Sequence, residues 1–334
     1  MIRESLAKIV RREDLDEVEM AQVMEEVMSG QATEAQMGAF LAALATKGET
    51  FAELAGAARA MRRKAVRVNV TSPVVVDTCG TGGDAAGTFN ISTTAAFVVA
   101  GCGVTVAKHG NRSVSSQCGS ADVLEALGLK LDVAPEVVEQ AVNEIGIGFL
   151  FAPLYHGALR HAANARKETG VRSIFNMLGP LTNPAGAAYQ LLGVYAPQLT
   201  EMFAQALRLL GGRRALVVHG HEGLDEISVC APTRVAELND GLVRTYDVTP
   251  EQLLGRSAKP EDLKGGGPQD NAAMLRGILR GERGPRRDVV LLNAAAALLA
   301  AGAASGFPQG IELASQAIDS GAAERKLDTL IEFT

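Results

Sequence analysis

The sequence predicts an α/β fold, with a small all-helical N-terminal domain and a large domain whose mostly parallel central sheet is flanked by helices. Residues 1–70 show only helical periodicity, whereas from Pro73 onward short apolar strand segments alternate with helical ones. Glycine-rich segments lie between the predicted strands and helices, as is typical of tight turns. A chain of 334 residues is long enough for two domains. We expect a helical domain at 1–70, joined by a helical return near 157–185, and an α/β domain at 71–334.

The N-terminal helices carry recognisable start signals. Thr33 with Gln36, and Thr50 with Glu53, have capping-box spacing, in which two side chains satisfy free backbone N–H groups at a helix start. Apolar residues recur at helical spacing, at positions 18, 20, 23, 24 and 27 and again at 37, 40, 41 and 44. A helical unit this short has several faces to bury, so we expect a homodimer that forms through it.

The large domain should begin as alternating strands and helices. The expected strands lie near 74–77, 104–107, 147–151, 190–195 and 215–219. The expected helices between them lie near 93–100, 121–126, 135–143 and 199–210. This alternation predicts a largely parallel sheet, with ligands bound beyond the carboxyl ends of its strands.

A different pattern follows Gly220. Segments 227–229, 234–238 and 242–246 predict a small antiparallel excursion, with Asn239-Asp240-Gly241 as a hairpin turn. The chain should then end in helices near 271–280, 288–301 and 311–319.

Composition excludes several classes of function. The chain has 32 Lys and Arg against 38 Asp and Glu, a net charge of −6 at pH 7, so we expect neither nucleic acid nor a membrane surface as a partner. The N-terminus lacks the apolar run of a secretory signal, and no apolar segment is long enough to span a bilayer. Four widely spaced cysteines indicate reduced thiols. We expect a cytoplasmic protein.

The most informative segment, 77–125, holds two turns rich in glycine, serine and threonine, each directly after a short apolar strand. In the first turn, glycines remove most Cβ atoms from a tight return, and polar residues lead into an apolar helix. Backbone N–H groups there can point at an anion, helped by the helix dipole. The residues concerned are Gly80, Gly82, Gly83, Asn90, Ser92 and Thr93.

The second turn adds two cations and several hydroxyls, which suits a doubly phosphorylated ligand. A lone glycine-rich turn can be no more than a tight connection, but two in tandem favour a phosphate site. Neither has the pattern of a P-loop or a dinucleotide fingerprint, so ATP-type and NAD-type sites are disfavoured. The second turn carries Lys108, His109, Asn111, Arg112, Ser113, Ser115 and Ser116, before a helix that begins near Ser120.

Adjacent carboxylates at Asp225 and Glu226 suggest a magnesium site. Mg²⁺ is usually held by one or two carboxylates together with the phosphates of a substrate. Neighbouring acids in a loop are commonly just solvated, but this pair follows a strand that ends near His219, which places it at the same sheet edge as the glycine turns. We interpret His219 and His221 as structural or solvated.

The segment 151–186 supplies a further candidate. Its Tyr155, His156, Arg160, His161 and Arg166 have near-helical spacing and would form a partly basic face. A planar Arg fork suits a carboxylate ligand, although a charged helix face is more often only solvated.

Seven motifs resemble, in this order, those of the anthranilate phosphoribosyltransferase family: GTGGD…GTFNIST, KHGNRSVSS, GSADVLEALG, FAPLYH, IFNMLGPLTNPAG, LVVHG and GLDEIS. The resemblance covers nearly the whole chain. It implies a glycosyltransferase, more closely a pentosyltransferase, of tryptophan biosynthesis. Such an enzyme moves the phosphoribosyl group of 5-phosphoribosyl 1-pyrophosphate (PRPP) to the amino group of anthranilate, giving N-(5-phosphoribosyl)anthranilate and pyrophosphate. It also implies a small helical domain, a large α/β domain and dimerisation through the former.

The resemblance also implies roles for individual residues. Lys108, Asp225 and Glu226 would be catalytic, and Ser92, Asp225 and Glu226 would bind Mg²⁺. Gly80, Asn111, His156, Arg166 and Pro180 would contact anthranilate or line its entry. PRPP would bind Gly80, Gly83, Asp84, Thr88, Asn90, Ile91, Ser92, Thr93, Lys108, His109, Gly110, Asn111, Arg112, Ser113, Val114, Ser115, Ser116 and Ser120. Two positions depart from the family pattern, Ala85 for a glycine and Gln117 for a lysine, and the second removes a cation near the phosphates.

The charges of this reaction indicate its mechanism. Departure of pyrophosphate leaves an oxocarbenium-like ribose, so catalysis should consist mainly of neutralising the leaving group and positioning the amine. Two other functions stay open at this point. A pyrimidine nucleoside phosphorylase would share the architecture, but its second loop reads differently from KHGNRSVSS. A nucleic-acid-binding relative would need a basic surface, which the net charge of −6 argues against.

Overall fold

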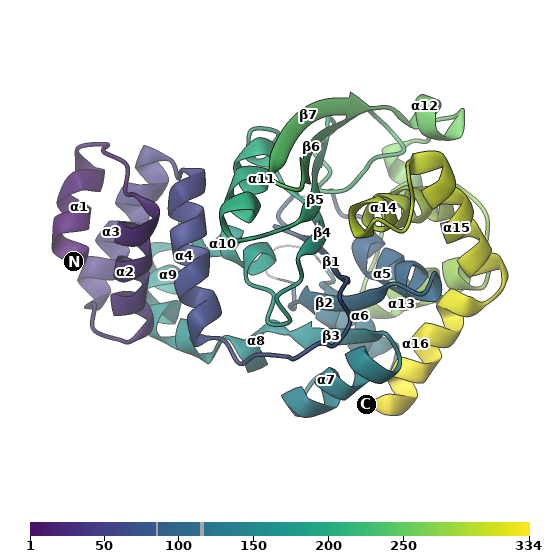
Figure 1. Ribbon diagram of the computed structural model, residues 1–334, viewed down its shortest axis with the longest axis horizontal. Coiled ribbons are helices and arrows are strands. Elements are labelled where there is room, and N and C mark those ends of the chain that lie inside the picture. The colour runs from purple at the N-terminus through teal and green to yellow at the C-terminus, as the bar shows by residue number, and fades with distance from the viewer. Residues whose placement is uncertain (85, 114–116) are drawn as a thin grey trace.

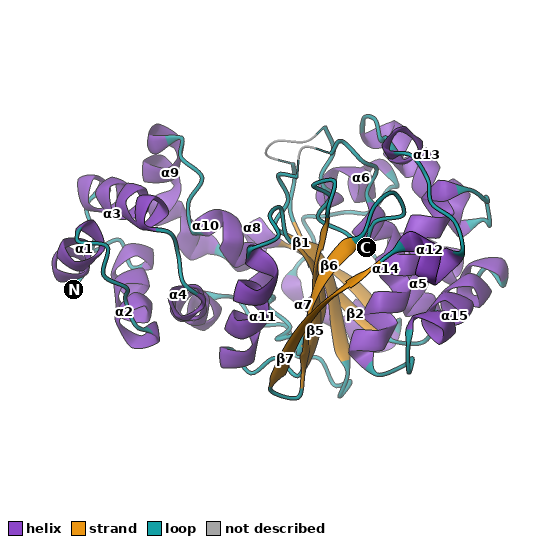
Figure 2. Cartoon of the chain, turned by 90° about the horizontal axis from the view of Figure 1, so that it is seen from above, coloured by secondary structure: helices purple, strands orange, loops and turns teal. Residues whose placement is uncertain are grey.

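The computed structural model describes residues 1–84, 86–113 and 117–334, and it shows a helical unit beside a larger α/β unit (Figure 1). In the described residues a mixed sheet of seven strands forms the centre of the α/β unit. Figure 2 shows helices on both sides of this sheet, with α5, α14 and α15 on one side and α11 towards the helical unit on the other. The predicted fold class is confirmed.

The helical unit combines N-terminal helices with a segment that returns from the middle of the chain. Helix η1 contacts α2, and α9 contacts α3. The N-terminal helices are α1 (Ile2–Val10), α2 (Glu17–Met28), α3 (Glu34–Lys47) and α4 (Phe51–Lys64). The returning segment contains α8 (Ala152–Tyr155), the 3₁₀ helix η1 (Gly157–Ala162), α9 (Ala163–Thr169), α10 (Phe175–Leu178) and the 3₁₀ helix η2 (Gly179–Leu181).

One buried carboxylate, that of Glu53, joins three parts of the helical unit. Its Oε1 accepts a hydrogen bond from Leu15 N at 2.9 Å. Its Oε2 accepts from Thr50 N at 2.8 Å and from Lys47 Nζ at 3.0 Å. The reciprocal bond from Glu53 N to Thr50 Oγ1 completes the predicted capping box. The same residue therefore starts α4 and ties it to the end of α3 and to the connection between α1 and α2.

The sheet has the strand order β3-β2-β1-β4-β5-β6-β7. All pairs from β3 to β5 are parallel, whereas β5–β6 and β6–β7 are antiparallel. Consequently β1 and β2 both end at the same edge, where the two glycine-rich turns begin. The strands are β1 (Val75–Gly80), β2 (Thr105–Gly110), β3 (Ile147–Phe151), β4 (Tyr189–Gly193), β5 (Arg214–Gly220), β6 (Thr233–Asn239) and β7 (Leu242–Val248).

Helices cover both faces of this sheet. None of the helices in the described ranges has the length and apolar character needed to cross a membrane. The helices of the α/β unit are α5 (Ile91–Gly101), α6 (Ser120–Ala126), α7 (Pro135–Glu144), α11 (Leu199–Leu209), α12 (Pro250–Leu254), η3 (Pro260–Leu263), α13 (Pro268–Leu279), α14 (Pro285–Ala301), α15 (Phe307–Asp319) and α16 (Ala322–Phe333).

Two predictions about the second half of the chain were wrong. Residues 227–229 form no strand, because side chains rather than a neighbouring strand satisfy their backbone groups: Ile227 N donates to Asn293 Oδ1 and Ser228 N to Thr233 Oγ1, both at 2.9 Å. The antiparallel pair β6–β7 is also no separate excursion, since β6 extends the central sheet by pairing with β5. Helix α16 (Ala322–Phe333) has no counterpart among the predicted helices.

A single asparagine in the alanine-rich helix α14 explains why segment 225–229 can turn without a ladder of backbone bonds. Asn293 is fully buried. Its Nδ2 donates to Ile227 O at 2.9 Å and to Val289 O at 2.8 Å, while its Oδ1 accepts from Ile227 N. Its amide thus replaces a strand partner for Ile227, the residue directly after Glu226.

Replacing Asn293 by Ala should therefore destabilise the protein. The change leaves buried backbone N–H and C=O groups of Ile227 without partners, which costs about 2–3 kcal/mol. Urea unfolding should show a fall of this size in the free energy of unfolding. Gln316→Ala, an exposed substitution on α15, is the matched control and should change it by less than about 0.5 kcal/mol. A variant as stable as the wild type would contradict this role of Asn293.

Candidate functional site

The first glycine-rich turn is held from two sides at Gly82. Its N–H donates to Asp225 Oδ2 at 3.0 Å, and its C=O accepts from Arg172 Nη2 at 3.0 Å. Gly82 and Gly83 both have positive φ, at 63° and 77°, which only glycine adopts readily. The turn that follows β1 is thus anchored to the carboxylate segment at 225–226.

The close approach of that segment depends on glycines at two strand ends. A Cβ on Gly193, the last residue of β4, would overlap the carbonyl oxygen of Asp225. A Cβ on Gly80, the last residue of β1, would lie 2.8 Å from Asp225 Oδ2. Glu226 then reaches the start of α5, where its Oε1 accepts from Ser92 N at 3.0 Å. Both carboxylates therefore lie at the edge where β1 ends.

The electrostatics of this carboxylate pair suit a divalent cation. Burial, reinforced by the nearby Asp84, raises the pKa of Asp225 to about 7. Burial, reinforced by Asp225, raises the pKa of Glu226 to about 8. Carboxylates crowded in this way gain most from a cation that neutralises both. In the described ranges no three His, Cys, Asp or Glu side chains are grouped to hold a metal, so oxygens of Ser92 and of a ligand would have to complete a shell around Mg²⁺.

Lys108 brings a buried positive charge to the same place. Its Nζ donates to Thr78 O and lies 3.4 Å from Ser92 Oγ. Burial lowers the Lys108 pKa, while the negative charges of Asp77 and of Glu226 oppose that shift. Asp77 is itself buried, which raises its pKa to about 6. Each of these two buried charges opposes the shift that burial imposes on the pKa of the other.

The second turn is shaped by a carboxylate and joined to the first by asparagines. Asp122 Oδ2 accepts from Ser113 N at 3.0 Å and from Gly119 N at 2.8 Å, which holds the base of the loop closed at the start of α6. Asn90, before α5, donates from Nδ2 to Cys118 O at 3.2 Å, and its Oδ1 accepts from Asn271 Nδ2 at 3.0 Å. The two turns therefore form one connected wall.

The predicted residues of these two turns lie in different surroundings, and only some have side chains free to meet a ligand. Arg112 is bound by Glu125, at 2.7 and 2.9 Å, and by Asp122 at 3.0 Å. Ile91 and Thr93 are buried, so only their backbones can face a ligand. Thr88 is bridged to Lys264, Asn111 is exposed, and the Ser120 hydroxyl donates to Asn111 O at 3.2 Å. Val114, Ser115 and Ser116 lie outside the described residues, as does the departure at Ala85; Gln117 is exposed.

Two buried histidines line the floor between the second turn and the helical return. His109 Nδ1 donates to Gly179 O at 3.1 Å, since a carbonyl can only accept. His109 Nε2 must then accept from His156 Nε2, 3.2 Å away. Burial lowers the pKa of His109 to about 3 and that of His156 to about 4. Both rings are neutral at pH 7, and Pro180 is buried next to Gly179.

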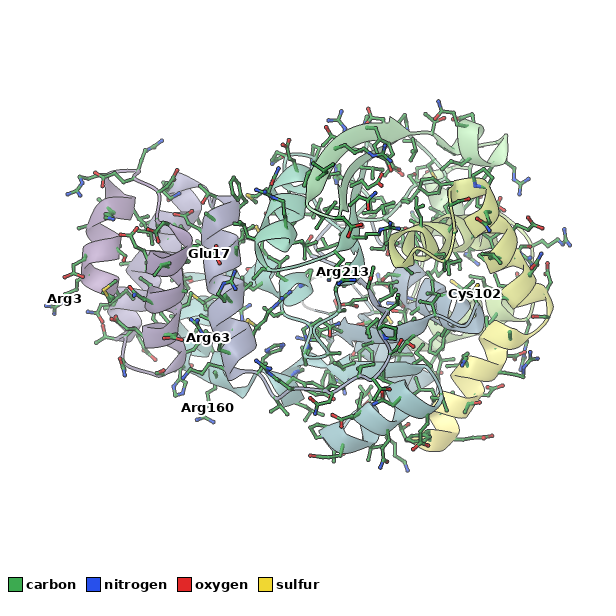
Figure 3. The ribbon with its side chains drawn as sticks, viewed as in Figure 1. Arg3, Glu17, Arg63, Cys102, Arg160 and Arg213 are labelled. Carbon is green, nitrogen blue, oxygen red and sulfur yellow. The ribbon has the colours of Figure 1, made fainter. Side chains whose placement is uncertain are left out.

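The helical return separates residues that the sequence analysis placed on one basic face. Tyr155 and His156 are buried, whereas Arg160 is exposed and lies at the outer edge of the helical unit (Figure 3). His161 packs against Gly30. The predicted common face is wrong, because the 3₁₀ helix η1 interrupts the helical spacing.

Arg166 keeps the properties expected of an anion-binding residue. It is half-buried, which lowers its pKa, and its guanidinium lies over the Phe175 ring at 5.1 Å. No ion pair joins it to any of the described residues. A cation held by stacking, with its hydrogen-bond donors free, is suited to a planar carboxylate.

Arg172, which was not predicted from the sequence, links three segments of the site. Its guanidinium donates to Gly82 O and lies over the Tyr195 ring, 3.3 Å from the centroid. Asn183 was also not predicted as a site residue; its Nδ2 donates to Asp77 Oδ2 and to Ala107 O, both at 2.8 Å. Arg172 has no distinguishing local pattern, whereas Asn183 lies in the motif IFNMLGPLTNPAG but was interpreted only as part of a rigid turn. His219 Nδ1 donates to Val194 O at 2.7 Å and His221 is exposed, so neither joins the site.

The buried histidine pair predicts a pH dependence of stability. The pKa of His156 is lower in the folded protein (about 4) than its ordinary value of 6.5, so the unfolded chain takes up the proton first as the pH falls. Stability from this group is therefore complete above pH 6.5 and is lost on acidification, by about 2 kcal/mol between pH 7 and 5.

The measurement compares urea unfolding of wild type and His156→Gln at pH 7 and pH 5. The variant keeps a side-chain donor for His109 but has no imidazole to protonate. Its stability should fall less between the two pH values than that of the wild type, by about 2 kcal/mol. Equal losses in the two proteins would contradict the assignment of a buried neutral His156.

Comparison with known proteins agrees with this architecture. The helical bundle domain of a glycosyl transferase family matches residues 3–65, and the α/β domain of the same family matches residues 72–324. Anthranilate phosphoribosyltransferase of Syntrophobacter fumaroxidans is 74% identical over 334 residues, covering 100% of this chain and 99% of the relative. That of Desulfosudis oleivorans is 68% identical over 335 residues, with coverage of 100% and 99%.

Solved structures show the same relationship. The crystal structure of anthranilate phosphoribosyltransferase from Thermus thermophilus superposes with a TM-score of 0.93 at 46% identity and covers 98% of each chain. The enzyme from Saccharomyces cerevisiae in complex with PRPP and Mg superposes with a TM-score of 0.89 at 28% identity, covering 99% of this chain and 98% of that one. With this similarity over its whole length, the chain belongs to the anthranilate phosphoribosyltransferase family.

Proposed function

We propose that this protein transfers the phosphoribosyl group of PRPP to the amino group of anthranilate, forming N-(5-phosphoribosyl)anthranilate and pyrophosphate in tryptophan biosynthesis. The observation that carries the proposal is the meeting of the first glycine turn, the Asp225–Glu226 pair and Lys108 at one sheet edge. Family membership at 74% identity supports the same substrates.

The donor would lie along the wall formed by the two turns. Backbone N–H groups of the first turn and of the start of α5, other than those of Gly82 and Ser92 that bind the carboxylates, would face its pyrophosphate, aided by the dipole of a helix of 11 residues. The remaining PRPP contacts are proposed at the second turn. Arg112 is already paired with Glu125 and Asp122. We expect it to position the second turn, and to contact PRPP only when those ion pairs open.

Ser92, Asp225 and Glu226 would hold Mg²⁺. The fit rests on the chemistry of the donors, two crowded carboxylates and a hydroxyl, with Ser92 hydrogen-bonding to Glu226. When bound, the ion would supply positive charge to the departing pyrophosphate. Lys108 would stabilise the same developing charge from the protein side, held in place by Thr78 and Ser92.

The acceptor would lie between the first turn and the helical return. Arg166 would bind the carboxylate of anthranilate, and Gly80 and Asn111 would contact the ring and amine. His156 and Pro180 would line the entry. An aromatic amine is unprotonated near pH 7, so positioning rather than a strong base would deliver the nucleophile. The neutral His109–His156 pair is consistent with this absence of charge.

Three further features belong to this proposal. The domain boundaries are 1–70 with the return at 157–185, and 71–334. The protein acts in the cytoplasm as a homodimer that forms through the helical unit. Val10, Val18 and Phe51 in or beside that unit are exposed apolar side chains that such contacts could cover.

The direct test mixes the protein with PRPP, Mg²⁺ and anthranilate and follows the loss of anthranilate fluorescence. Signal loss should need all three additions and should be accompanied by stoichiometric release of pyrophosphate. Phosphorolysis of uridine or thymidine, with no consumption of anthranilate, would instead identify a nucleoside phosphorylase and overturn the proposal.

Removing the negative charges of Asp225 and Glu226 should weaken metal-dependent turnover. Asp225→Asn combined with Glu226→Gln preserves shape but removes the charge that attracts Mg²⁺, so we expect kcat to fall about 100-fold or more at low Mg²⁺. Glu222→Gln, an exposed change in the same loop that keeps an acceptor for Ser228, is the matched control. Normal turnover of the double variant at low Mg²⁺ would exclude these residues as ligands.

Arg166→Ala should act on the acceptor and not on the donor. Loss of a charged, bidentate contact costs about 1.5–3 kcal/mol of binding free energy. The KM for anthranilate should therefore rise about 10- to 100-fold, while the KM for PRPP changes little. Arg160→Ala, on the same return but exposed, should leave both constants unchanged. Equal rises in the two KM values of Arg166→Ala would remove it from the acceptor site.

A further inference from the structure

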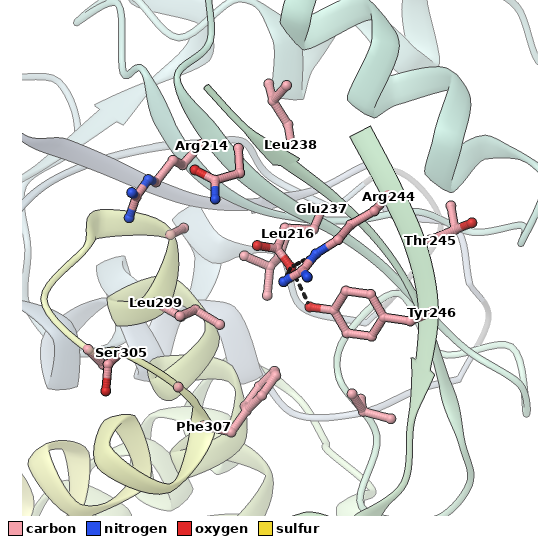
Figure 4. A pocket seen from close by; sticks show the side chains of 15 residues that line it. Arg214, Leu216, Glu237, Leu238, Arg244, Thr245, Tyr246, Leu299, Ser305 and Phe307 are labelled. Atoms are coloured by element: carbon pink, nitrogen blue, oxygen red, sulfur yellow. Dashed lines mark hydrogen bonds and ion pairs between the residues drawn. The ribbon is translucent and has the colours of Figure 1, made fainter. Parts of the chain in front are cut away.

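A cavity of about 640 Å³ lies where the antiparallel extension of the sheet meets the loop between α14 and α15 (Figure 4). Its lining includes Arg214, the first residue of β5, whereas the proposed catalytic groups lie near the strand ends at Gly80 and Gly193. In a parallel arrangement these are opposite edges of the sheet. The volume falls within the range of small-molecule sites, about 300–1,000 Å³.

An incompletely bonded carboxylate, that of Glu237, faces this cavity. The residue is only 7% exposed. Its Oε2 accepts from Arg244 Nε at 3.1 Å, Arg244 Nη2 at 2.9 Å and Tyr246 Oη at 2.8 Å. Its Oε1 accepts no hydrogen bond from the described residues, yet it is not among the atoms that are sealed from solvent. Oε1 is therefore an acceptor that is open to the cavity and well suited to a ligand N–H group.

Arg214 provides a positive charge on the same face of the sheet. It pairs with Asn239 across β5–β6, while Leu216 pairs with Glu237, so the Arg214 and Glu237 side chains are diagonal neighbours. Its ion partner is Asp240, at 3.8 Å and on the exposed hairpin turn. An ion pair this long and solvent-exposed is weak, which leaves the guanidinium available to an anionic group.

The rest of the lining is largely apolar and aromatic. Leu216 lies on the floor, Leu299 and Phe307 face it from α14 and α15, and the Tyr246 ring closes the side next to Glu237 (Figure 4). Arg244 and Arg214 balance Glu237 and Asp240, so the surrounding charge is close to zero. A ligand with a net charge gains little binding energy in this cavity. A ligand with one positive group, one negative group and an apolar side chain can contact Glu237, Arg214 and the apolar lining at the same time.

We propose that this cavity binds the zwitterion of an α-amino acid with an apolar side chain. The ammonium group donates to Glu237 Oε1, and the carboxylate accepts from the Arg214 guanidinium. The side chain packs against Leu216, Leu299 and Phe307. This site is separate from the substrate site, so its ligand is neither donor nor acceptor in the transfer reaction.

The test is isothermal titration calorimetry of the intact protein with L-phenylalanine as the probe. Two analogues each lack one charge: 3-phenylpropionate has no ammonium group, and phenethylamine has no carboxylate. L-Phenylalanine should bind saturably at one site per chain, and each analogue should bind at least 10-fold more weakly. Absence of saturable L-phenylalanine binding, or equal binding of all three probes, would overturn the proposal.

Variants locate the binding. Arg214→Gln removes a half-exposed cation and should weaken L-phenylalanine binding at least 10-fold, as should Glu237→Gln. Arg213→Gln, a change of the exposed neighbour labelled in Figure 3, is the matched control and should bind as the wild type does. Affinity that is unchanged in Arg214→Gln shows that the ligand lies elsewhere. Because Arg214 is not buried, that result does not depend on whether Glu237→Gln folds.

Discussion

The site depends on the contact between segment 225–226 and the start of the first turn. Gly82 N–H and Ser92 N–H each donate to one of the adjacent carboxylates, at 3.0 Å. These two bonds place Asp225 and Glu226 at the edge where β1 ends, although 143 residues separate Gly82 from Asp225. Without these bonds the first glycine turn would lose its anchor to segment 225–226. The two carboxylates would then lie in a solvated loop between β5 and β6.

The surrounding structure permits and maintains this contact. Gly193 and Gly80 leave room for the carboxylate segment, and Asn293 satisfies the backbone of Ile227 from the opposite side. Lys108 and Asp77 are both buried nearby and bonded to Thr78 and to Asn183 respectively, while Arg172 ties the first turn to the helical return. The helical unit is therefore connected to the sheet edge of the candidate site by polar contacts as well as by packing.

Periodicity and turn chemistry were enough to predict the fold class, the parallel strands and the starts of α3, α4 and α6 from the sequence. These features are local, because a cap or an apolar strand needs only its neighbours. The failures involved the choice of partner. Residues 227–229 have strand-like composition but bond to side chains, one of them 66 residues away, and the local hairpin pattern of β6 and β7 did not reveal that β6 also pairs with β5. Arg172 and Asn293 act through contacts 90 and 66 residues away.

The account is tested most directly by locating the metal. A crystal grown with PRPP and Mn²⁺ in place of Mg²⁺ would show the ion by its anomalous scattering. We expect a peak beside the carboxylates of Asp225 and Glu226, and a pyrophosphate near the turn that follows Gly80. A peak remote from both carboxylates, or a pyrophosphate bound away from that turn, would contradict it.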